Sequence, residues 1–151
     1  MTEMSDPGGA LTSAPASRVV VEALGSVLDG DAATARDRLL AGAEATSWAA
    51  VLRRLDVAGR ALTLDAAIAP SGARAWMAHV AALAAAAGVD PLPSGISDVL
   101  VAWSRGDGIP VQVDLTTDQV GVVPEAERAW AAMLVLACLV DRSGFPPQVV
   151  A

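Results

Sequence analysis

Few residues in this chain could carry catalytic chemistry. His79 is the only histidine, and histidine is a common general acid or base near neutral pH. In a pocket, His79 could act as a general base that Asp107 or Asp114 orients from the irregular segment after residue 105. The alternative is a structural histidine that is hydrogen-bonded at a helix junction. Spacing alone does not decide between these two interpretations.

Metal and cofactor chemistry has little support in the residue types. The single cysteine, Cys138, excludes an internal disulfide framework and a cysteine-based zinc cluster. Cys138 lies inside an apolar run, where burial should raise the thiol pKa and leave it unreactive. The aspartates do not form a calcium-loop ladder, and no phosphate loop, dinucleotide fingerprint or HExxH motif is present. We therefore expect neither a metal nor a cofactor.

Tryptophans are the largest side chains in this alanine-rich sequence. The four are Trp48, Trp76, Trp103 and Trp130. Together they could line a cavity for an apolar ligand, since ligand pockets are mostly apolar with a few polar groups. They could equally be ordinary core residues, which is the commoner use of a buried aromatic side chain.

A long apolar helix over residues 124–143 must position these side chains. Pro124 suits the first helical position, Glu125 and Glu127 favour the positive end of the helix dipole, and Gly144 can end the helix in a left-handed conformation. Between Arg128 and Asp141 every residue is apolar except Cys138. A helix that is apolar on all sides is enclosed by other elements, and these twelve residues are too few to span a bilayer.

Apolar residues at three- and four-residue spacing predict further helices around it. These cover residues 17–28, a second helix from Asp31, 48–68, 71–87 and 96–106, with Ser17, Asp31, Ser47 and Ser71 as capping residues. In the third helix, Gly59 indicates a close helix crossing, and Asp56 could pair with Arg60 on the solvated side. Residues 111–115 alternate between apolar and polar, which favours a small hairpin with residues 120–123.

The expected fold is all-α, a compact bundle of five to six helices around the central helix 124–143. It contains at most one small β-hairpin, at 110–123. Residues 1–16 are rich in Gly, Pro, Ser and Thr, so we expect a flexible N-terminal tail. Residues 17–151 are then a single helical domain, in line with the chain length.

Charge narrows the range of partners. The net charge is −7, and all ten basic residues are arginine. Nucleic-acid affinity depends on neutralising phosphates, so we expect no nucleic acid as a partner, and an acidic chain is equally disfavoured at anionic membranes. No basic region followed by an apolar run opens the sequence, so we predict a cytoplasmic protein.

Three functions remain compatible with these features. The first is a non-catalytic helical interaction or accessory protein, with a protein partner or homodimeric self-association. The second is a small cofactor-independent enzyme, an isomerase or cyclase that acts on an apolar molecule in a Trp-lined pocket, with His79 and an aspartate as acid and base. The third is a regulator that binds a small molecule. The missing motifs favour the first.

Overall fold

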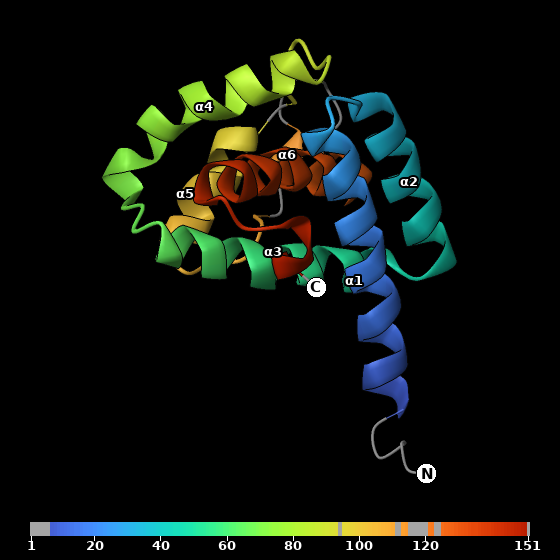
Figure 1. Cartoon of the computed structure of the whole chain (residues 1–151). Coiled ribbons are helices and arrows are strands. Elements are labelled where there is room, and N and C mark those ends of the chain that lie inside the picture. The colour runs from blue at the N-terminus through green and yellow to red at the C-terminus, as the bar shows by residue number, and fades with distance from the viewer. Residues whose placement is uncertain (1–6, 94, 111–112, 115–120, 123–124, 151) are drawn as a thin grey trace.

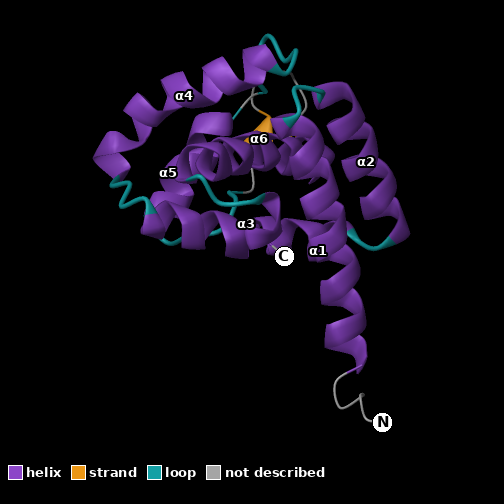
Figure 2. Ribbon diagram, viewed as in Figure 1, coloured by secondary structure: helices purple, strands orange, loops and turns teal. Residues whose placement is uncertain are grey.

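The computed structural model describes residues 7–93, 95–110, 113–114, 121–122 and 125–150. Within these residues the chain forms six α-helices, two two-residue strands and two short 3-10 turns (Figures 1 and 2). The helices are α1 (Pro7–Leu28), α2 (Ala32–Ala45), α3 (Trp48–Asp65), α4 (Ala73–Ala86), α5 (Ile96–Ser104) and α6 (Glu125–Ser143). The 3-10 turns are η1 (Pro70–Gly72) and η2 (Pro147–Val150). This confirms the all-α class.

Helix α6 is the centre of the fold. Every residue from Ala129 to Val140 is buried, and each of the other five α-helices contacts α6. Figure 1 shows α6 in the middle of the molecule, with the other helices arranged around it. The ends follow the expected chemistry, with acidic residues in the first turn, Arg142 in the last and Gly144 at φ +78°. The central helix was therefore predicted correctly from its uniform apolarity, although Pro124 lies outside the described residues.

Polar caps begin two of the helices as expected. The Asp31 carboxylate accepts hydrogen bonds from the backbone N and hydroxyl of Thr34, and Ser47 Oγ accepts from the backbone N of Ala50. Ser71 was expected to begin α4 in the same way, and this was wrong. It lies instead in η1, and α4 begins without a side-chain cap, because Pro70 starts a tight 3-10 turn there.

The first helix begins ten residues earlier than expected. Helix α1 starts at Pro7 and not after Ser17, and its first turns extend beyond the rest of the molecule in Figure 1. Ala16 is fully buried against the core, so the helix is anchored there, and it continues towards the N-terminus with Pro15 inside it. The expected tail is thus helical from residue 7, and residues 1–6 lie outside the described part.

A minimal antiparallel hairpin joins α5 to α6. Strand β1 (Val113–Asp114) pairs with β2 (Gly121–Val122), with Val113 opposite Val122. This agrees with the small hairpin expected at 110–123, whose connecting residues 115–120 are outside the described residues.

No helix in the described part of the chain combines the length and apolarity needed to cross a bilayer.

Candidate functional site

The three candidate catalytic residues are not gathered at one described site. His79 lies exposed on α4, and its ring meets Trp76 edge-on at 5.5 Å between centroids. Asp107 is exposed just after α5, where its backbone N donates to the carbonyl of Ala102. Asp114 belongs to β1, of which the structure describes only the backbone. Neither cavity described below is lined by His79 or Asp107, so their catalytic role stays a prediction.

The tryptophans occupy four separate environments. Trp48 is half-buried at the start of α3, and Trp76 is half-buried on α4 under the guanidinium of Arg142, at 5.6 Å. Trp103 of α5 is buried, and Trp130 of α6 is buried with Arg36 over its ring at 5.9 Å. Only Trp103 and Trp130 line the described cavities, and they line different ones. A single cavity walled by all four is therefore absent from the described residues.

Cys138 has the environment expected for an inert thiol. It is buried within α6, and desolvation raises its pKa to about 11. A thiol with this pKa is almost fully protonated at neutral pH, so it is a poor nucleophile and a poor metal ligand. Among the described residues, no three His, Cys, Asp or Glu side chains cluster as a metal site would require.

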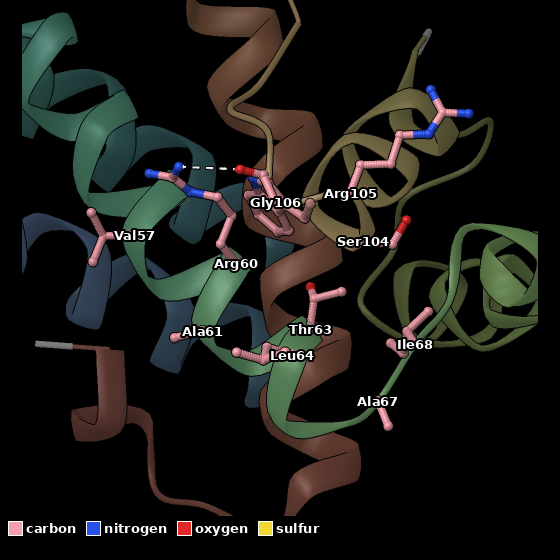
Figure 3. Close-up of a pocket in the computed structure, with 11 residues that line it drawn as sticks. Val57, Arg60, Ala61, Thr63, Leu64, Ala67, Ile68, Ser104, Arg105 and Gly106 are labelled. Atoms are coloured by element: carbon pink, nitrogen blue, oxygen red, sulfur yellow. Dashed lines mark hydrogen bonds between the residues drawn. The ribbon is translucent and has the colours of Figure 1, made fainter.

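The larger described cavity is a groove between α3 and the end of α5, with a volume of about 550 Å³ (Figure 3). We call it the α3–α5 groove. The lining residues used below are Val57, Arg60, Ala61, Leu64, Trp103 and Arg105. Figure 3 shows the residues of α3 on one side and the residues at the end of α5 on the other, with Ala67 and Ile68 closing the lower end.

The base of the groove depends on a tight contact between α3 and α5. A Cβ added at Gly59 would lie about 2.4 Å from ring atoms of Trp103, so only glycine leaves room for this indole. The close crossing expected at Gly59 is therefore confirmed. The indole Nε1 of Trp103 donates to Asp56 Oδ1 at 2.9 Å, which satisfies the polar atom of a buried aromatic side chain.

Asp56 makes a second contact with the chain that follows α5. Its Oδ1 also accepts a hydrogen bond from the backbone N of Ile109 at 2.7 Å, and this bond fixes the chain that leaves α5. Arg60 does not pair with the Asp56 carboxylate as expected. Its Nε donates to the Asp56 carbonyl and its Nη1 to the carbonyl of Gly106, as Figure 3 shows for the second bond. The carboxylate turns inward because the indole and a backbone N–H compete successfully for it.

An apolar stripe on the outer face of α3 forms part of the wall of the groove. Val57, Ala61 and Leu64 are spaced at i, i+4 and i+7, which places them on one side of a helix. All three are exposed, and Leu64 at 81% is the most exposed large hydrophobic side chain among the described residues. Because α3 already buries Val51, Leu55 and Leu62 on its opposite face, the helix has two apolar faces and covers only one.

The second described cavity has a volume of about 320 Å³ and lies beside the start of α6. Arg36, Leu92, Glu127 and Trp130 are among its lining residues. Arg36 is above the Trp130 ring, so this side chain already covers the aromatic surface. The cavity therefore offers less free apolar surface than the α3–α5 groove.

Sequence reasoning did not identify the α3–α5 groove. The inward-facing residues of α3 accounted for the main periodicity, and Asp56 and Arg60 were interpreted as part of its solvated side. The available signal was the second stripe, because Leu64 follows Leu62 by two residues, about 200° around the helix. Two leucines in this relation cannot share one face of a helix.

Comparison of the chain with protein-family models, with curated proteins and with solved structures finds no match.

Proposed function

We propose that this protein is a non-catalytic interaction protein that binds another protein along the outer face of α3, over the α3–α5 groove. The observation that carries the proposal is the exposed stripe of Val57, Ala61 and Leu64. A contiguous exposed apolar patch on a soluble domain is typical of an interaction site.

The exposure of this stripe is not a consequence of an incomplete core. Helix α6 is buried along twelve successive residues, and the inward face of α3 is packed against it. Covering Leu64, which is 81% exposed, would remove most of its apolar surface from water, and full burial of an exposed leucine contributes roughly 1.5–3 kcal/mol. Val57 is already partly covered, so its contribution would be smaller. A partner that covers this face would therefore provide this stabilisation without any rearrangement of the bundle.

The enzyme and regulator alternatives have weaker support. An enzyme of the expected kind needs His79 and an aspartate beside an apolar cavity, whereas His79 is exposed on α4 and the larger cavity lies between α3 and α5. A small-molecule regulator needs a pocket that encloses most of its ligand. Leu64 lines the α3–α5 groove but remains largely in solvent, a geometry that suits a protein surface better.

The proposal is tested with Leu64→Ser, which removes the most exposed part of the stripe. The matched control is Val149→Ser, at a second exposed apolar side chain that does not line the groove. Each tagged chain is used to capture binding proteins, and any captured protein is then purified and titrated against both variants. We expect Leu64→Ser to abolish the complex and Val149→Ser to leave its affinity within about twofold.

Self-association is measured in the same series by light scattering at two protein concentrations. A wild-type dimer that Leu64→Ser converts to a monomer would assign the stripe to a homodimer interface instead. Equal binding of every partner by both variants, without self-association, would contradict the proposal.

A further inference from the structure

We infer that the partner segment is an amphipathic helix that places apolar side chains against Leu64 and a carboxylate at the Gly106 end of the α3–α5 groove. This inference rests on the proposed function and specifies the chemistry of the partner. Three features of the site lead to it: the spacing of the stripe, the charges along the groove and the consequence of pairing two copies.

The spacing of the stripe matches a helix. Val57 and Leu64 are two turns apart on α3, about 10 Å along the axis. Apolar residues at i, i+4 and i+7 form the surface that a second helix packs against, and helix-in-groove recognition uses anchors at this spacing. The groove beside the stripe gives such a helix a place to insert its larger side chains, with Trp103 among the lining residues.

The charges in the groove favour an acidic partner. Arg60 and Arg105 line it and no Asp or Glu does, although the chain as a whole carries −7. Both arginines flank Gly106, because Arg60 Nη1 donates to the Gly106 carbonyl and Arg105 precedes it in the chain. Figure 3 shows Arg60 beside Gly106 and the Arg105 side chain extending outward on the other side of Gly106, both above Leu64 and Ile68 in this view. The groove is therefore basic at one end and apolar at the other.

The nearby aspartates do not cancel this charge at the groove wall. The Asp56 carboxylate is directed to Trp103 and Ile109, and Asp107, although exposed, is not among the lining residues. A carboxylate of the partner would therefore meet the arginines first.

A second copy of the chain fits this surface poorly. A two-fold interface brings the same patch together from both subunits. With the two α3 helices parallel, Arg60 and Arg105 of one copy would approach the same arginines of the other. With the helices antiparallel, these arginines would face the apolar Leu64 end of the other copy, where no Asp or Glu lines the groove. Like charges across an interface oppose association, so the groove is better suited to a different, acidic chain.

The test uses a displayed library of random peptides of about sixteen residues, long enough for roughly four helical turns. Binders to the wild-type protein are selected after depletion on Leu64→Ser. Selected peptides are labelled, and their affinities are measured by fluorescence anisotropy against Arg105→Glu and against a control, Arg18→Glu. Arg18 is exposed on α1 and does not line the groove.

We expect Leu64-dependent peptides that are rich in Asp and Glu and become helical on binding. Arg105→Glu should weaken them about fivefold at about 0.05 M salt, and this difference should shrink at about 0.5 M salt. Arg18→Glu should have little effect, and thermal melts verify that both variants are folded.

Two failures are distinguishable. Leu64-dependent peptides that lack acidic residues, contain internal proline or ignore Arg105→Glu overturn this inference and leave the proposed function in place. A selection that yields no Leu64-dependent peptide overturns the proposed function, and this inference with it.

Discussion

Asp56 connects three parts of the molecule through one carboxylate. Its Oδ1 accepts from the buried indole of Trp103 and from the backbone N of Ile109. Both donors are held close to α3, where Gly59 gives the indole room. A charged residue on a helix face that was expected to be solvated therefore determines the position of α5 and of the chain that follows it.

Replacing Asp56 with alanine should destabilise the fold by about 1–3 kcal/mol, because the buried indole N–H would lose its acceptor. Asp56→Asn keeps a carbonyl oxygen that can accept a hydrogen bond, so its destabilisation should be less than half that of Asp56→Ala. Urea unfolding followed by tryptophan fluorescence measures both variants, with Asp65→Ala as an exposed control on the same helix. If Asp56→Ala were as stable as the wild type, the hydrogen bonds from Trp103 and Ile109 would contribute nothing to the stability of the fold.

Asp31 makes stability depend on pH. The side chain and then the backbone N–H of Thr34 donate to its carboxylate and lower its pKa below the ordinary 3.8. A group with a depressed pKa in the folded state contributes stability above its unfolded pKa, and this contribution is lost as pH falls through the lower folded pKa. The contribution is therefore complete well above pH 3.8 and disappears below it.

Asp31→Ala should therefore lower the melting temperature at neutral pH, and its difference from wild type should narrow as the pH falls below 3.8. Asp31→Asn, which can still cap the helix but does not titrate, should remain closer to wild type at neutral pH. Melts across a pH series measure this. A difference for Asp31→Ala that stays constant to the lowest pH would contradict the capping argument.

At the scale of elements, α6 explains why the bundle needs five surrounding helices. Leu134 and Leu136 lie about 200° apart around this helix, and both have no exposed surface. A single neighbouring layer could cover only one of them. The structure buries both within one chain, so no partner is required to complete the core.

Leu134→Ala and Leu136→Ala should each destabilise the fold by about 2–5 kcal/mol, the transfer and cavity cost of a buried leucine. Leu64→Ala, at the exposed stripe, should change stability by no more than about 0.5 kcal/mol. Thermal melts at two protein concentrations should rank the three variants in the same order of stability. A nearly silent change at either α6 leucine would mean that one side of this helix is uncovered in solution.

At the scale of the whole molecule, charge controls what approaches the surface. The chain has seventeen acidic residues against ten arginines, so its average field repels polyanions. We predict no binding of labelled duplex DNA or single-stranded RNA at about 0.1 M salt. Anisotropy titrations test this, and binding that weakens steeply with added salt would contradict it.

The helical class, the central helix and most helix positions could be predicted from the amino-acid sequence alone. Uniform apolarity over residues 129–140 requires enclosure whatever the neighbours are, and caps such as Asp31 and Ser47 act within one turn of their own chain. Local chemistry of this kind can be read without knowing the fold. The early start of α1 was missed because Ala16 is held by the core, which composition does not show.

The long-range contacts of the side chains could not be predicted in this way. Asp56 was expected to face Arg60 four residues away, but Trp103, forty-seven residues along the chain, takes its carboxylate. The same holds for the α3–α5 groove, which exists because α5 crosses α3 at Gly59 and leaves Leu64 beyond the contact. Periodicity assigns residues to faces of a helix, but which face is covered depends on contacts between segments that are distant in the sequence.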